Sequence, residues 1–172
     1  MTTSETQTIR LSEVIAPSFY PVHTDIKRAL HTHYWLKGGR GSCKSTFAAI
    51  EIIKGMMQDP DANAIVFRKV ASTLAESVLA QLQWVIHALG VDHLWKTKQS
   101  PITLIFLPTG QRIVFRGADN PRKVKSVKLS RGYLKYAWYE EVDEFTGPDE
   151  LRTINQSVLR GGDKFAVFYT FN

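Results

Sequence analysis

The residues with the clearest chemistry form one short run, Gly38-Gly39-Arg40-Gly41-Ser42-Cys43-Lys44-Ser45. In the phosphate-binding pattern G-x-x-x-x-G-K-[ST], called the P-loop, glycines let the backbone fold around a phosphate. The lysine reaches the β and γ phosphates, and the hydroxyl holds Mg²⁺. The run fits this pattern at every defined position except one. It therefore predicts a nucleotide site made by Gly38, Gly39, Arg40, Gly41, Ser42, Cys43, Lys44, Ser45 and Thr46.

Cys43 is the exception, because it stands where the pattern has its second glycine. Glycine keeps a Cβ away from the backbone and the phosphate, so Cys43 requires either a negative φ or a slightly relaxed loop. We expect the small side chain to be tolerated and nucleotide binding to survive. We also expect bound ATP to shield the thiol from alkylation.

Two adjacent carboxylates, Glu140 and Glu141, follow the apolar run Tyr136–Tyr139 directly. Nucleotide hydrolysis needs a carboxylate that holds Mg²⁺, usually through water, and a group that positions or activates the attacking water. Because side chains alternate along a strand, the two glutamates point in different directions. We assign Glu140 to the metal, together with Ser45, and Glu141 to the water. The alternative is a merely solvated strand end.

Strands and helices alternate around these residues. A buried, nearly continuous apolar strand such as 64–68 is typical of a parallel sheet covered by helices on both faces. Thr73 and Glu76 have the spacing of a capping box, so we expect a helix from Thr73 to Gly90. We predict an α/β fold with a mainly parallel central sheet and a β-hairpin insertion around 108–110. The expected strands are 33–37, 64–68, 102–107, 111–116, 136–139 and 164–171, and the other helices cover 44–57 and start near Pro148.

The first 24 residues lack a sustained period. Phe19 and Tyr20 could pack against a nucleotide base, although packing in the core is the favoured use.

Length and composition limit what else the chain can be. With 172 residues, 44% of them hydrophobic, we expect one domain covering 1–172. The single cysteine excludes an intrachain disulfide, and the sequence shows no signal peptide and no run of membrane-spanning length. The net charge of +6 favours a polyanionic partner such as nucleic acid, or else a solvated basic loop. The basic residues are densest at Arg122, Lys123, Lys125, Lys128 and Arg131.

Five segments occur in the order GGRGSCKS, AIVFRK, RGADNPRKVKS, YAWYEEVDEF and FYTFN. In this the chain resembles phage terminase large subunits, and in particular their PBSX-like branch, where a glutamate pair replaces the usual Asp-Glu. The resemblance implies a P-loop ATPase of the ASCE type that uses ATP and Mg²⁺ to drive double-stranded DNA into a procapsid. It also implies a portal protein, a small terminase subunit and a homo-oligomeric ring as partners, all in the host cytoplasm.

The resemblance also implies roles for single residues. Lys44, Arg40 and Glu141 are the expected catalytic residues, with Arg40 reaching the γ phosphate. Thr170 and Asn172 match a coupling motif that transmits the state of the nucleotide to the parts that grip DNA. Arg131 is the candidate arginine finger for a neighbouring subunit, although Arg116, Arg122 and Arg160 are also available.

The RNase H-like nuclease domain that follows this region in full-length terminases has no counterpart in the sequence. We therefore expect an isolated ATPase domain without nuclease activity, which is a monomer when it is not assembled into a ring. Two other functions fit the same residues. One is a different P-loop DNA motor, such as a helicase or a repair ATPase. The other is a non-catalytic nucleic-acid-binding module with a degenerate P-loop.

Overall fold

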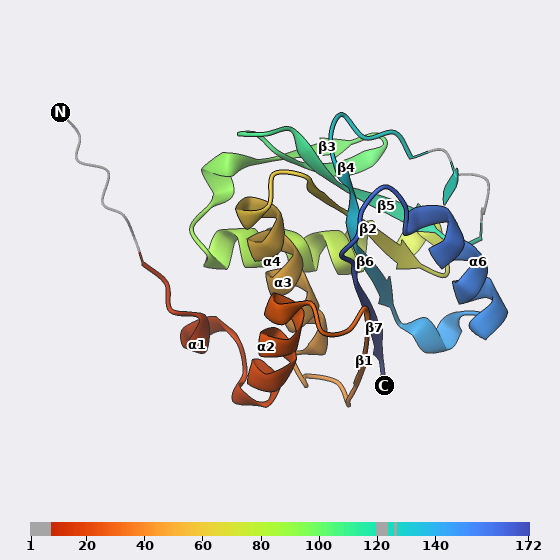
Figure 1. Cartoon of the computed structure of the whole chain (residues 1–172), viewed down its shortest axis with the longest axis horizontal. Coiled ribbons are helices and arrows are strands. Elements are labelled where there is room, and N and C mark those ends of the chain that lie inside the picture. The colour runs from red at the N-terminus through yellow and green to blue at the C-terminus, as the bar shows by residue number, and fades with distance from the viewer. Residues whose placement is uncertain (1–7, 120–123, 126) are drawn as a thin grey trace.

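A seven-stranded sheet forms the centre of the part of the chain that the computed structural model describes, residues 8–119, 124–125 and 127–172 (Figure 1). The strand order is β1-β7-β6-β2-β5-β4-β3. Neighbouring strands are parallel from β1 to β5, whereas β4 and β3 are paired antiparallel. The strands are β1 (His33–Lys37), β2 (Ala62–Arg68), β3 (Trp95–Gln99), β4 (Ile102–Phe106), β5 (Gln111–Gly117), β6 (Tyr133–Glu140) and β7 (Ala166–Phe171).

Helices cover both faces of this sheet. Figure 1 shows α2, α3 and α4 on one face and α6 on the other, and a separate core cluster lies on each face. The helices are α1 (Leu11–Val14), α2 (Tyr20–Arg28), α3 (Lys44–Gln58), α4 (Ala80–Ala88) and α6 (Pro148–Val158). Single turns lie between them: η1 (Pro17–Phe19), η2 (Ala71–Thr73), η3 (Ala75–Leu79, a π-helical turn), η4 (Asp92–Leu94) and η5 (Val142–Glu144).

The fold class predicted from the sequence is confirmed, as is the hairpin between β4 and β5. The hairpin extends the main sheet, because β5 also pairs parallel to β2. The predicted helix after the P-loop is α3, and it begins at Lys44 as expected. Phe19 packs in the core, where its ring stacks on Phe47 with centroids 4.5 Å apart.

The prediction of a capping box at Thr73 is wrong. Thr73 lies inside the turn η2, and its hydroxyl donates to the carbonyl of Val70 at 2.9 Å instead of capping a helix. The extended residue before this turn is Val70, which has no side-chain group that can cap. The helical stretch therefore starts earlier and contains the π-helical turn η3 before α4.

The elements α1, α2 and β3 were not predicted from the sequence. In β3 the sequence WKTKQ has one buried residue, Trp95, because β3 is an edge strand whose other positions are mostly solvated. Of the dense basic stretch, Arg122 and Lys123 lie outside the described residues, while Lys125, Lys128 and Arg131 are exposed. None of the helices in the described ranges has the length and apolar character needed to cross a membrane.

Candidate active site

The loop between β1 and α3 is closed by its own backbone and by the end of β7. The N–H of Gly38 donates to the carbonyl of Phe171 at 3.2 Å, and the N–H of Ser42 donates to the carbonyl of Gly39 at 3.2 Å. A Cβ on Gly38 would lie 2.7 Å from the Ser42 hydroxyl, and Gly41 has a φ of 78°. Two of the glycines in the pattern are therefore required by the local backbone.

Cys43 has a φ of 60°, in the left-handed region. The expected negative φ is therefore wrong, because the loop keeps the backbone conformation that a glycine would adopt there. For a residue with a Cβ this conformation costs roughly 1–2 kcal/mol. The side chain is exposed, so no neighbour has to move to make room for it.

Lys44 joins the loop to the end of β7. Its ammonium group donates to the carbonyls of Gly38 at 2.6 Å and Gly39 at 3.2 Å, and to Oδ1 of Asn172 at 2.9 Å. Lys44 is the first residue of α3. The ammonium group and the positive end of the helix dipole therefore lie at the same end of α3, where both favour an anion.

Ser45 and Glu140 meet across the cleft. The Ser45 hydroxyl lies 2.9 and 3.1 Å from the two carboxylate oxygens of Glu140. Thr170 on the neighbouring strand β7 donates to the same carboxylate, and Trp138 Nε1 donates to Thr170 Oγ1 at 2.9 Å. Mg²⁺ prefers oxygen ligands and binds proteins through one or two carboxylates, so this donor set fits the metal that the P-loop pattern requires.

Glu141 contacts a different partner from Glu140. It lies just past β6 with a φ of 54°, and its carboxylate forms an ion pair with Arg68 at the end of β2. Arg68 also lies 3.5 Å from the carboxylate of Glu144. Burial raises the pKa of Glu141 and the nearby charges of Glu144 and Glu140 raise it further, whereas Arg68 lowers it; the net direction is upward.

Arg68 is the site residue that sequence reasoning missed. Its side chain is 11% exposed, and its Nε has no hydrogen-bond partner among the described residues. One signal in the sequence could have found it. Arg68 ends a fully buried strand, and the carboxyl end of a parallel strand lies at the edge where ligands bind.

One cleft of about 190 Å³ is lined by most of the predicted site residues. The other residues of the predicted nucleotide site, Gly38, Gly39, Ser42, Cys43 and Thr46, do not line it. The hydroxyl of Thr46 accepts from Gln81 of α4 at 3.3 Å. The cleft is lined by Arg40, Gly41, Lys44, Ser45, Glu140, Glu141, Thr170, Phe171 and Asn172.

The candidate trans arginines lie elsewhere. Arg131 precedes β6, whereas Glu140 ends it, so the two are at opposite edges of the sheet, and Arg131 pairs with Asp61 at 3.1 Å. Arg116 and Arg160 donate to backbone carbonyls, those of Phe115 and Gln156 respectively. Arg122 is outside the described residues.

The fold and the cleft define the class of protein, a P-loop NTPase of the ASCE type. The family follows from sequence comparison. The model of the family described as phage terminase large subunit matches residues 30–172, and the chain belongs to this family.

Two curated relatives match a large part of the chain. It is 43% identical to the terminase large subunit of Bacillus phage SPP1 over 168 residues, which are 95% of this chain and 40% of the relative. It is 37% identical to the PBSX phage terminase large subunit of Bacillus subtilis over 113 residues, 66% of this chain and 25% of the relative. The chain therefore spans less than half the length of these relatives.

Solved structures of packaging proteins share the fold. The large terminase of bacteriophage HK97 superposes with a TM-score of 0.66 at 16% identity, over 96% of this chain and 34% of that one. The N-terminal domain of the DNA packaging ATPase of bacteriophage phi29 gives 0.65 at 15% identity, over 90% and 79%. The large terminase of a thermophilic bacteriophage in complex with ADP gives 0.56 at 15% identity, over 84% and 34%.

Proposed function

We propose that this chain is the ATP-hydrolysing motor domain of a phage terminase large subunit and powers translocation of double-stranded DNA into a procapsid. The observation that carries the proposal is the contact between the P-loop and the end of β6, where the Ser45 hydroxyl lies 2.9 Å from the Glu140 carboxylate. A phosphate-binding loop alone binds nucleotide. A loop joined to two adjacent glutamates also has the groups that hydrolysis needs.

ATP binding rests on the loop and on Lys44. The backbone N–H groups at the start of α3 would receive the phosphates, and Lys44 would exchange its bonds to the Gly38 and Gly39 carbonyls for bonds to phosphate oxygens. Arg40 lines the same cleft, and we assign it to the γ phosphate. The ADP complex of the large terminase from the thermophilic bacteriophage supports nucleotide binding by this fold.

Ser45 and Glu140 would hold Mg²⁺, Glu140 through water, and the bound ion would neutralise charge on the phosphates. Glu141 is the proposed base that orients the attacking water. Its ion pair with Arg68 keeps the carboxylate oriented and favours the ionised form that can accept a proton.

Thr170 bonds to Glu140 and Asn172 bonds to Lys44. Both ends of the proposed coupling motif therefore touch groups that would respond to the nucleotide.

The assembly is also a proposal. Proteins of similar fold include a DNA packaging ATPase and a chain of a viral genome packaging motor assembly, both from phi29. This likeness supports DNA as the substrate and assembly into a motor. The proposal extends this to double-stranded DNA and to a homo-oligomeric ring in the host cytoplasm. A portal protein and a small terminase subunit would complete it. Arg131 stays the candidate arginine finger for the ATP site of a neighbouring subunit. Its exposed position at the opposite edge of the sheet excludes a role in the ATP site of its own subunit.

Steady-state ATP turnover with and without double-stranded DNA tests the proposal. We expect Lys44→Ala to lower turnover at least about 100-fold, as the removal of one donor to developing charge does in other enzymes. Lys96→Ala on β3, an exposed lysine outside the cleft, is the matched control and should turn over like wild type. Wild-type turnover no higher than that of Lys44→Ala would reject the motor in favour of a non-catalytic binding module.

A further inference from the structure

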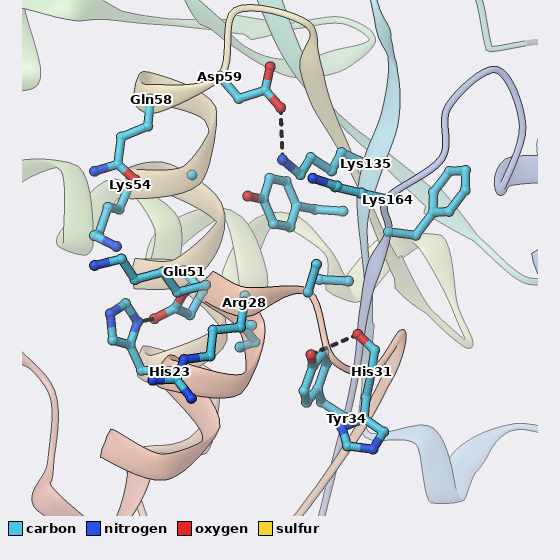
Figure 2. A pocket seen from close by; sticks show the side chains of 17 residues that line it. His23, Arg28, His31, Tyr34, Glu51, Lys54, Gln58, Asp59, Lys135 and Lys164 are labelled. Atoms are coloured by element: carbon cyan, nitrogen blue, oxygen red, sulfur yellow. Dashed lines mark hydrogen bonds and ion pairs between the residues drawn. The ribbon is translucent and has the colours of Figure 1, made fainter.

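A second cavity lies at the opposite edge of the sheet from the proposed ATP site (Figure 2). Its walls come from the end of α2, the last turns of α3 and the starts of β6 and β7, so four segments that are separate in the sequence meet there. We call it the basic pocket. It is defined by its five lysine and arginine residues, Lys27, Arg28, Lys54, Lys135 and Lys164.

The charges of the basic pocket do not balance. Its lining contains two carboxylates, Glu51 and Asp59, and each is already paired. Glu51 is hydrogen-bonded to His23 at 2.5 Å, and Asp59 pairs with Lys135 at 2.8 Å; Figure 2 draws both contacts.

Four cations remain. Within the described ranges, no ion pair or side-chain hydrogen bond involves the charged groups of Lys27, Arg28, Lys54 or Lys164. Lys54 is half-buried in the wall, whereas the other three are exposed at the rim. In Figure 2, Lys54 extends from α3, Arg28 from the end of α2 and Lys164 from the segment before β7. Glu51 lies near Lys54, but five cations against two carboxylates still leave the pocket with excess positive charge. Like charges gathered around a hollow are stabilised by a bound anion.

The floor of the pocket adds a neutral donor. Tyr136 is 5% exposed, and a Cβ on Gly55 would meet its hydroxyl at 2.0 Å, so a glycine in α3 is needed to admit the ring. Burial raises the pKa of this hydroxyl, which therefore stays protonated and able to donate.

The size of the pocket limits its ligand. Its volume is about 230 Å³, below the roughly 300–1,000 Å³ of pockets that enclose drug-sized ligands. A single phosphate group fits this volume better than a whole nucleotide does. The rim cations Arg28, Lys27 and Lys164 lie at the exposed mouth of the pocket and can contact neighbouring phosphates of the same polymer.

We propose that the basic pocket binds backbone phosphates of double-stranded DNA, with one phosphate at Lys54 and adjacent phosphates at the rim. The assignment of the polymer to DNA rests on the proposed function. Helix α3 begins at the P-loop and ends at this pocket, and its 15 residues span about 22 Å. The same rigid element therefore carries Lys44 at one end and Lys54 near the other, which gives nucleotide and DNA a direct mechanical connection.

Equilibrium binding of a fluorescein-labelled DNA duplex of about 30 base pairs, followed by anisotropy without nucleotide, tests the proposal. The pocket variant is Lys54→Glu with Lys164→Glu. The control is Lys96→Glu with Lys98→Glu on β3, which changes the net charge equally on an exposed strand. We expect the pocket variant to bind the duplex at least about 10-fold more weakly than wild type. The magnitude of the slope of log K against log[salt] should fall by about 1.8, which corresponds to the loss of two phosphate contacts. The control should stay within about 3-fold of wild type.

A pocket variant that binds duplex as tightly as wild type would overturn the proposal, as would an equal loss in the control. If Lys54→Glu prevents folding, Lys54→Gln with Lys164→Gln replaces it, with the same expected slope change of about 1.8, because the same two phosphate contacts are lost. Inorganic phosphate, titrated at constant ionic strength, distinguishes the source of the anion. We expect it to bind at least about 10-fold more weakly than the duplex, because one phosphate cannot reach the rim. Phosphate binding as tight as that of the duplex would make the pocket a free-anion site and reject DNA.

ATP turnover of the same pocket variant is measured without DNA. Loss of duplex binding with normal turnover supports the pocket, and normal duplex binding overturns it whatever the turnover. The failure of Lys44→Ala to lower turnover would reject the proposed function alone, because Lys44 does not line the pocket.

Discussion

The two edges of the sheet carry two different kinds of charged site. At the edge where the parallel strands end, the polar groups of the cleft bond to one another in pairs: Lys44 to Asn172, Ser45 to Glu140, and Glu141 to Arg68. At the edge where the strands begin, Lys54 and the rim cations have no such partners in the described part of the chain. The first edge is preorganised for a small ligand that inserts between matched groups. The second presents unmatched charge, which suits a long polyanion.

The largest effect of a single change should come at the first edge. We expect Ser45→Ala to lower ATP turnover about 100-fold and to raise the Mg²⁺ concentration needed for half-maximal turnover, because the hydroxyl beside Glu140 is lost. Turnover measured across a Mg²⁺ titration checks this. Ser42→Ala, in the same loop but without a bond to Glu140, should cost less. Equal losses would mean that the loop as a whole matters, and not the contact with Glu140.

Arg68→Met should have the next largest effect. It leaves Glu141 without its counter-charge and next to Glu144 and Glu140, so the carboxylate loses its fixed orientation. We expect kcat to fall about 10-fold while KM for ATP stays within about 2-fold, which is the pattern for a group that acts mainly in the transition state.

Arg68→Lys keeps a positive charge and should recover part of kcat. Arg152→Met, on the exposed surface of α6, is the control. An increase in KM without a change in kcat would contradict a role of Arg68 in positioning Glu141.

The smallest effect concerns stability at the second edge. Burial raises the pKa of Glu51, and the nearby His23 and Lys54 only partly oppose this. The folded chain therefore holds the Glu51 proton at a pH where the unfolded chain has lost it. This contribution to stability is complete below the ordinary glutamate pKa of about 4.3 and is lost as pH rises through the folded value.

Urea unfolding of wild type and Glu51→Gln from acid to neutral pH checks this prediction. The free energy of unfolding of wild type should fall relative to that of Glu51→Gln as pH rises. Glu76→Gln, which changes an exposed glutamate, should follow wild type. A constant difference between wild type and Glu51→Gln across the range would show that burial does not raise the pKa of Glu51.

The first edge was largely predictable from the sequence, and the reason is topology. Lys44, Ser45 and Glu140 follow strand signals, and the carboxyl ends of parallel strands lie at one edge. Their proximity therefore followed once the sheet was taken to be parallel, without knowledge of the strand order.

What the sequence did not predict depends on the strand order or on the local backbone. The pair of Arg68 and Glu141 exists because β2 lies next to β6, and no local pattern encodes that neighbour. Likewise, Cys43 keeps a left-handed conformation because the surrounding loop requires it, against the preference of the residue itself. The basic pocket collects residues from four separate segments, so its charges are scattered in the sequence and gave no dense basic run.

The central claim is that the edge where the parallel strands end hydrolyses ATP with Glu141 as the base. The most direct test compares Glu141→Gln with Asp143→Asn, the same loss of a carboxylate at an exposed position two residues further on. Both turnover and the alkylation rate of Cys43, with and without Mg-ATP, are measured. We predict that Glu141→Gln loses turnover at least about 100-fold while ATP still protects Cys43, and that Asp143→Asn behaves like wild type. Turnover by Glu141→Gln equal to that of Asp143→Asn would contradict the claim.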